Sequence, residues 1–132
     1  MTISIQELIA QAIHASQNAY IPYSNYPVGA ALAATDGLTV YQGCNIENAS
    51  YPAGICAERS ALASAVSAGV REFSTLVIAT RGGGSPCGIC RQALYEFAPR
   101  LRVILVDLDG KIHHDTTLDA LLPLGFNHDD LK

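Results

Sequence analysis

"LVIATRGGGSPCGICRQALYEFAPRLRVILV", residues 76–106, is the stretch that decides the fold. It begins and ends with an apolar run typical of a buried strand, and a helix is predicted between the two runs. Ser85 is suited to the N-cap of that helix, Pro86 to its first position and Pro99 to a place beyond its end, so we expect a helix from Ser85 to about Phe97. A strand, helix and strand in this order predict a right-handed crossover between parallel strands.

Two hairpins are predicted around this unit. Asp36-Gly37 and the turn 107–110 are both typical of a short connection between antiparallel strands. The strand pairs that they join are Val28–Ala34 with Leu38–Cys44, and Val103–Val106 with Ile112–His114. The last strand should therefore be antiparallel to its neighbour.

Three further helices complete the chain. The first begins at a capping box formed by Ser4 and Glu7, carries an apolar stripe, and is closed by Pro22. The second should run from about Cys56 to Ala68, and a short one should lie near Leu118–Leu122. The order αββαβαββα predicts the α/β class: a three-layer α/β/α sandwich around a mixed five-stranded sheet, as one domain of residues 1–132.

Composition narrows the class of partner. Hydrophobic residues make up 49% of the chain and charged residues only 15%, which favours burial of surface between subunits. A net charge of −4 without a Lys/Arg cluster argues against nucleic acid, and the apolar runs are far shorter than the ~20 residues of a membrane span. Because no nucleic-acid signal is visible, a small-molecule substrate is expected. Four cysteines without a recognisable secretion signal indicate a reducing, cytoplasmic compartment.

Three cysteines and a glutamate form the candidate site. Cys87 and Cys90 are three residues apart at a helix start, hence on one side of that helix, where the helix dipole favours thiolates. Cys56 and Glu58 are two residues apart and converge only if Cys56 lies at the tip of its helix. Two helix tips would then direct three thiolates and one carboxylate to a common point.

Three interpretations of these residues remain open. Cys87-x-x-Cys90 alone is equally typical of a thioredoxin-like thiol oxidoreductase, although that function leaves Cys56 and Glu58 without a role. A closed, non-catalytic zinc module needs a fourth ligand, and the available Cys44 ends a predicted strand, where we expect it to be packed. Three protein ligands leave an open position, which is typical of catalytic zinc.

The spacing Cys56-x-Glu58 followed by Pro86-Cys87-x-x-Cys90 resembles the zinc-dependent nucleobase and nucleoside deaminases. The resemblance is closest to the small homotetrameric cytidine deaminases and covers essentially the whole chain. The segments that carry it are "YSNYPVGAAL", "GCNIENASY", "CAERSAL", "SPCGICRQ" and "LLPLGF".

The resemblance implies hydrolytic deamination of cytidine and deoxycytidine in pyrimidine salvage. It implies one zinc ion per chain, held by Cys56, Cys87 and Cys90, which activates water as hydroxide for attack at C4. Glu58 would be the catalytic proton shuttle, and Arg59 would tune the charge of the ligand thiolates.

The same resemblance implies a set of substrate-binding residues. Asn45 and Glu47 would hold the ribose 3′-hydroxyl, Tyr26 would flank the base, and Ala57 would offer backbone polar groups to the pyrimidine. Phe126 would enter the site of a neighbouring subunit in a homotetramer with shared active sites. Tyr51, Arg91 and Gln92 also fit the pattern but receive no firm role.

A related alternative is a deaminase for another aminopyrimidine nucleoside, such as blasticidin S. "NIENAS" favours the ordinary nucleoside because the residues expected at the ribose are intact.

Overall fold

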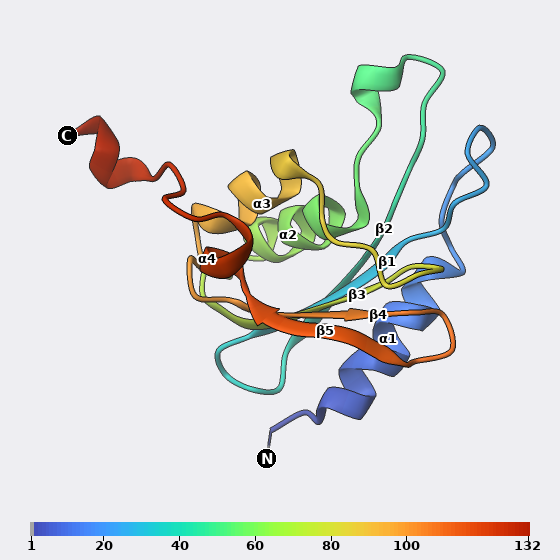
Figure 1. The fold of residues 1–132 in the computed structure, drawn as a ribbon, viewed down its shortest axis with the longest axis horizontal. Coiled ribbons are helices and arrows are strands. Elements are labelled where there is room, and N and C mark those ends of the chain that lie inside the picture. Colours follow the sequence, from blue (N-terminus) through green and yellow to red (C-terminus); the bar gives the residue numbers. More distant parts are fainter. Residues whose placement is uncertain (1) are drawn as a thin grey trace.

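The structure, a computed structural model, describes residues 2–132. Its centre is a five-stranded sheet with the order β2-β1-β3-β4-β5 (Figure 1). The strands are β1 Gly29–Ala34, β2 Val40–Cys44, β3 Phe73–Ala79, β4 Arg102–Val106 and β5 Ile112–Thr117. β3 and β4 are parallel and every other neighbouring pair is antiparallel, so the predicted mixed sheet and both predicted hairpins are confirmed.

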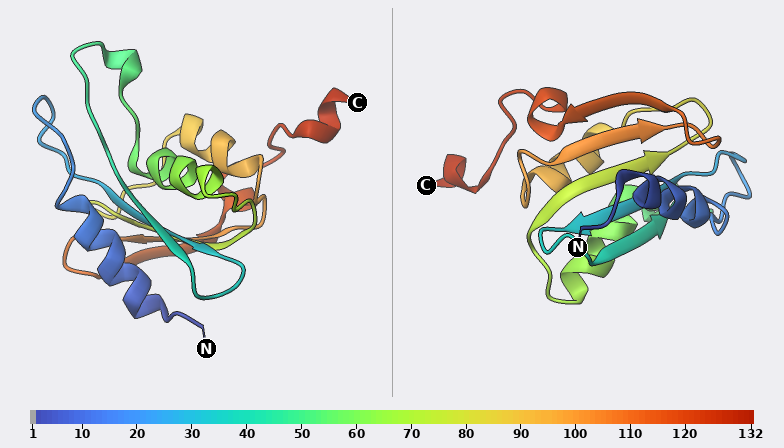
Figure 2. Two further views of the ribbon diagram at one scale, coloured as in Figure 1. Left: turned by 180° about the vertical axis from the view of Figure 1, so that it is seen from behind. Right: turned by 90° about the horizontal axis from the view of Figure 1, so that it is seen from below.

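Helices cover both faces of the sheet (Figure 2). They are α1 Ile5–Ser16, α2 Ala57–Ser67, α3 Gly88–Tyr95 and α4 Leu118–Leu121, with 3₁₀ turns at Tyr51–Ala53 and His128–Leu131. Alternate residues of β3 explain the layers: Val77 packs in the cluster with α1, whereas Leu76 and Ile78 pack in the cluster with α2 and α3. The predicted three-layer α/β architecture is therefore confirmed. None of the helices in residues 2–132 has the length and apolar character of a membrane span.

Two glycines allow helices to approach the sheet closely. A Cβ at Gly29 would lie 1.9 Å from the Ala12 carbonyl oxygen in α1. A Cβ at Gly43 would lie 2.4 Å from the Ala57 carbonyl oxygen in the first turn of α2. The missing side chain at Gly43 thus lets β2 set the position of the helix tip that carries Cys56.

The predicted start of α3 was wrong by two residues. Cys87 is the N-cap, with φ −67° and ψ 167°, in place of Ser85. Ser85 Oγ and the Pro86 carbonyl instead accept hydrogen bonds from the Arg91 guanidinium, which keeps this segment outside the helix. The last turn also ends earlier than predicted, at Tyr95.

Other boundaries differ at element ends. α1 ends at Ser16, well before Pro22, because the chain continues in tighter turns in which the amides of 17–19 bond to carbonyls three residues back. β5 runs on to Thr117, where it pairs with Arg102 at the start of β4. The Arg102–Asp115 ion pair, 2.7 Å between Nη2 and Oδ2, supports this added length.

Candidate metal centre and active site

The structure brings together three cysteine sulfurs. The Sγ atoms of Cys56, Cys87 and Cys90 all lie within 4.8 Å of one another. Cys56 is the N-cap of α2 and Cys87 the N-cap of α3, and neither side chain caps its own helix. Cys90 follows in the first turn of α3 and is fully buried. The two helix tips therefore direct all three thiols into one space, as the sequence predicted.

The distances between these sulfurs fit a zinc ion. Zinc is tetrahedral with Zn–S bonds of about 2.3 Å, which places neighbouring sulfurs about 3.8 Å apart. The Cys56 and Cys87 Sγ atoms are 3.9 Å apart, too far for a disulfide. Cys44 lies outside the group, at the end of β2. Three sulfur ligands leave one position of a tetrahedral ion for another molecule.

Electrostatics favour thiolate at this point. The hydrogen bond with the Cys90 thiol, together with Arg59 and Cys87, lowers the pKa of Cys56 to about 5 against the opposing effect of burial. The partner thiol responds in the opposite direction, because its bond to Cys56 and its burial raise the pKa of Cys90. Without a metal, the two sulfurs thus hold one proton between them, and a cation would displace it.

Arg59 supplies a positive charge next to the sulfurs. Its Nη2 donates to Cys56 Sγ at 3.7 Å from one turn further along α2. Bonds to the Cys90 and Cys56 sulfurs raise the pKa of the guanidinium, so Arg59 stays charged. Its Nε is buried and has no hydrogen-bond partner among residues 2–132. The contact proposed for Arg59 from the sequence is present.

Glu58 is a buried acid beside the sulfur cluster. Its residue is 4% exposed in the first turn of α2, and it lines the pocket described below. Burial, and secondarily the negative charge of Cys56, raises the pKa of this carboxyl. A carboxyl with a raised pKa takes up and releases a proton closer to neutral pH than an ordinary glutamate does.

A pocket of about 760 Å³ opens in front of Cys56, Glu58 and Cys87. Side chains from segments 23–28, 45–59 and 78–87 line it. Residues 23–28 and 45–55 belong to the long loops that rise beyond the sheet at the upper right of Figure 1, whereas residues 56–59 are the tip of α2. A bound molecule would therefore contact the helix tips on one side and these loops on the other.

Asn45 and Glu47 anchor the loop across the pocket. Asn45 Oδ1 accepts from the Val28 amide at 3.0 Å, and its Nδ2 donates to the Tyr26 carbonyl at 2.8 Å. Glu47 Oε1 accepts from the Tyr23 amide at 3.0 Å and from the Ser24 amide at 3.1 Å. Both residues thus line the pocket and also hold its wall in place.

The other predicted substrate residues fall into two groups. Tyr26 and Ala57 line the pocket with Asn45 and Glu47. Phe126 does not line it: the residue lies beyond α4 on the projecting C-terminal segment and is 54% exposed. The Gln92 side-chain amide donates to the Phe126 carbonyl at 2.8 Å.

Ser24 and Arg91 also build the site, although the sequence predicts no role for either. Ser24 donates from its hydroxyl to Glu47 Oε2 and accepts from the Tyr26 amide, so it joins two candidate substrate residues. Arg91 holds the approach to α3 through Pro86, Ser85 and the Leu121 carbonyl. These contacts join segments that are far apart in the sequence, so no local sequence pattern predicts them.

Comparison with known proteins agrees with this geometry. Residues 2–106 match the family model described as the cytidine and deoxycytidylate deaminase zinc-binding region. The chain belongs to this family of deaminases. The match places a zinc-binding region over the segment that contains Cys56, Cys87 and Cys90, so zinc is the metal of this site.

Individual deaminases resemble the chain over nearly its full length. A cytidine deaminase of Sporosarcina psychrophila is 48% identical over 133 residues, covering 98% of this chain and 96% of the relative. One from Halalkalibacterium halodurans is 44% identical, covering 96% and 97%. The crystal structure of the Burkholderia pseudomallei cytidine deaminase superposes with a TM-score of 0.89 at 44% identity, covering 94% and 100%.

A deaminase with a different name is more distant. The blasticidin-S deaminase of Bacillus cereus is 31% identical over 113 residues, covering 78% of this chain and 79% of the relative.

Proposed function

We propose that this protein is a zinc-dependent cytidine deaminase, which hydrolyses cytidine and deoxycytidine to uridine and deoxyuridine with release of ammonia. The observation that carries the proposal is the convergence of three sulfurs and the buried Glu58 at one end of a pocket. Near-full-length similarity to cytidine deaminases, including one at 48% identity, supports the same substrate.

Cys56, Cys87 and Cys90 would hold the metal. Zinc, when bound, supplies the Lewis acidity that makes water a nucleophile at neutral pH. Glu58 would accept one proton of that water and deliver it to N3 of the pyrimidine as the oxygen adds to C4. It would then take the proton of the new C4 hydroxyl and pass it to the amino group, which leaves as ammonia when the C4–N bond breaks. The raised pKa of Glu58 suits both directions of transfer. Arg59 offsets part of the negative charge of the three thiolates.

The pocket wall would hold the nucleoside. We assign Tyr26 to the face of the base, Ala57 to backbone bonds with the pyrimidine edge, and Asn45 and Glu47 to the ribose 3′-hydroxyl. Each amide and carboxylate has hydrogen-bonding capacity left after its contacts with the loop. Because that loop already orders them, little conformational entropy is lost when the sugar binds.

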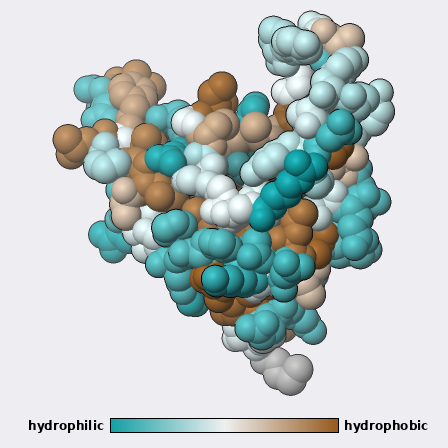
Figure 3. Space-filling view, turned by 45° about the vertical axis from the view of Figure 1, so that its right-hand side comes forward, coloured by the Kyte–Doolittle hydropathy of each residue, from teal (hydrophilic) through white to brown (hydrophobic). Residues whose placement is uncertain are grey.

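The proposal extends to a homotetramer with shared active sites, in which Phe126 enters the pocket of a neighbouring subunit. Large apolar side chains are exposed on the single chain, and Figure 3 shows several such patches on one face. On the C-terminal segment they are Leu124, Phe126 and Leu131. Light scattering coupled to size exclusion tests this: a tetramer is expected, and a monomer at assay concentration would contradict it.

We further propose a role in pyrimidine salvage within a reducing cytoplasm, as one domain of residues 1–132. The support is that all four cysteines, which lie within residues 2–132, are free thiols, and that one sheet organises both apolar clusters.

A nucleoside panel tests the function. Purified protein is expected to contain zinc and to convert cytidine and deoxycytidine. The conversion is measured as loss of cytidine absorbance and as release of ammonia. Blasticidin S in the same panel tests the related alternative, and its exclusive turnover would replace cytidine as the substrate. Disulfide reduction by zinc-free protein, with no deamination, would instead support the thiol oxidoreductase.

A further inference from the structure

Arg81 contacts the pocket wall from outside the pocket. It follows β3 closely, and its Nη2 donates to the Asn25 carbonyl, 56 residues away in sequence. Its guanidinium carbon lies 5.7 Å from the centroid of the Tyr26 ring. This distance is within the range at which a cation and an aromatic face attract each other. Arg81 thus contacts two consecutive residues of the loop 20–28.

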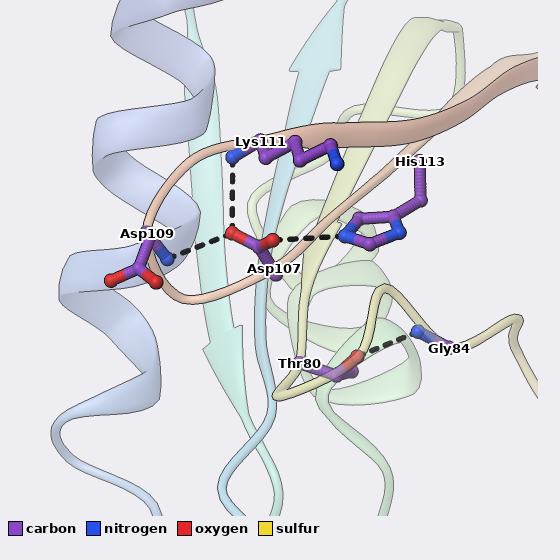
Figure 4. Close-up of polar contacts among 6 residues, drawn as sticks. All are labelled: Thr80, Gly84, Asp107, Asp109, Lys111 and His113. Atoms are coloured by element: carbon purple, nitrogen blue, oxygen red, sulfur yellow. Dashed lines mark hydrogen bonds and ion pairs between the residues drawn. The ribbon is translucent and has the colours of Figure 1, made fainter.

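The base of Arg81 is fixed to the sheet. Thr80, just before it, is 4% exposed, and its amide donates to the Val106 carbonyl at 3.1 Å. Its hydroxyl accepts from the Gly84 amide at 2.7 Å and closes the turn 80–84 (Figure 4). The same turn leads directly to Ser85 and Cys87. This hydrogen-bonded turn therefore carries Arg81 and begins the approach to the metal site.

The segment that Arg81 contacts has its own local hydrogen bonds, since the Asn25 amide donates to the Ile21 carbonyl at 3.1 Å and the Tyr26 amide to Ser24 Oγ at 3.1 Å. Asn25 has φ +54°, a left-handed conformation that asparagine adopts more readily than most residues with a side chain. Asn45 and Glu47 hold the backbone at Tyr23, Ser24, Tyr26 and Val28, but no hydrogen bond of theirs reaches Asn25. The Tyr26 ring lines the pocket, whereas Arg81 does not. Arg81 therefore supports the ring from its outer side.

We propose that Arg81 is a positioning residue for nucleoside binding, which holds the Tyr26 ring against the pocket through its guanidinium and holds the loop backbone through the Asn25 carbonyl. The inference rests on the proposed function, in which Tyr26 flanks the base. Because the ring would contact the base before and during the reaction alike, loss of its support is expected to raise KM and leave kcat nearly unchanged.

A double-mutant cycle tests this. Arg81→Ala is expected to raise KM for cytidine about 2- to 10-fold, with zinc content unchanged, and Arg81→Lys to restore part of the loss because it keeps a cation. In a Tyr26→Ala background, Arg81→Ala should cost little more, since the ring that it supports is gone. Arg71→Ala, which removes an exposed arginine beyond α2, is the matched control and should behave as wild type. Independent, multiplying losses, or an unchanged KM in Arg81→Ala, would overturn the proposal.

A second readout does not depend on turnover. The chain contains no tryptophan, so Tyr26→Trp places a single fluorophore at the ring position. Removing Arg81 in this variant is expected to lower the fluorescence anisotropy because the indole ring becomes more mobile. It is also expected to shift the emission to longer wavelength because the ring becomes more exposed to water. Identical spectra with and without Arg81 would overturn the positioning role even in active enzyme. Wild-type protein that deaminates no nucleoside would instead refute the proposed function, while the spectra would still decide whether Arg81 supports the ring.

Discussion

The Arg59 guanidinium lies 3.7 Å from the Cys56 sulfur, one helical turn away on α2. Cys56 is the N-cap of the helix, so the partial positive charge of the helix end and the full charge of Arg59 act on the same atom. Together they favour the thiolate that a metal requires. The competition between protons and zinc at this sulfur therefore depends on a residue that is not itself a ligand.

Arg59→Ala is expected to release zinc at a higher pH than wild type. The positive charge contributes to the lowered pKa of Cys56, so without it protons compete with the metal at higher pH. Zinc release during acid titration, followed with a chromophoric chelator, measures the midpoint. Arg71→Ala serves as a control outside the site, and equal midpoints for Arg59→Ala and wild type would contradict the role of Arg59.

Glu58→Gln is expected to lower kcat by about 10²- to 10⁴-fold while zinc content stays at the wild-type level. Glutamine keeps the size of the side chain but cannot take up or deliver the proton. Steady-state kinetics with metal analysis measures both quantities, and Glu72→Gln, an exposed residue just before β3 that does not line the pocket, is the control. Full activity of Glu58→Gln would exclude Glu58 as the proton shuttle.

Cys56→Ala, Cys87→Ala and Cys90→Ala are each expected to lose most of their zinc and to melt at a lower temperature, because metal binding and folding are coupled. The chain provides its own control in Cys44, which lies outside the sulfur cluster. Cys44→Ala should keep about one zinc ion per chain. Loss of zinc from Cys44→Ala, or its retention in a ligand variant, would require a different ligand set.

Gly43→Ala is expected to destabilise the protein by about 1–3 kcal/mol or more, because the added methyl group overlaps the backbone of α2. Its Cβ would lie 2.4 Å from both the Ala57 carbonyl oxygen and the Ala61 amide nitrogen. Denaturant unfolding measures the change. Gly82→Ala, where a Cβ meets no described atom within 4 Å, is the matched control and should unfold like wild type.

Asp107→Asn is expected to lower Tm at pH 7. The difference in Tm between the variant and wild type is expected to disappear at acidic pH. The hydrogen bond from the His113 ring lowers the pKa of Asp107 most, and the hydrogen bond from the Lys111 amide lowers it further (Figure 4). A carboxyl with a lowered pKa in the native state stabilises it fully above the ordinary value of 3.8, and this contribution is lost as pH falls below that value. Thermal melts between pH 7 and pH 2 measure the difference, and one that persisted unchanged in acid would contradict this account.

Local signals account for what the sequence predicted well. Asp36-Gly37 and the turn 107–110 are sufficient to pair their flanking strands, and the apolar runs around 76–106 imply the crossover. The convergence at the metal was predictable because Cys56 and Cys87 both stand at helix starts. The three cysteines predicted as zinc ligands are the three that lie together in the structure.

Tertiary contacts account for the features that the sequence did not predict. Ser85 and Pro86 have the right residue types to start a helix, yet Arg91 holds both outside it. Glu47 orders a loop 23 residues earlier in the chain, and Asn25, whose carbonyl Arg81 binds, lies 56 residues away. Such contacts exist only after the sheet has formed, so no window of sequence contains them.

The two sides of the pocket differ in their connection to the core. The tip of α2 packs directly on β2 at Gly43, whereas the loops of the opposite wall are bonded mainly to each other, through the bridges of Ile46 to Tyr20 and to Ile55 and the side-chain bonds of Asn45 and Glu47. Substitutions in that wall are therefore less costly to folding than changes at the metal. Directed evolution toward cytidine analogues with altered sugars should accordingly succeed first in segments 20–28 and 45–55, with the reaction chemistry left intact.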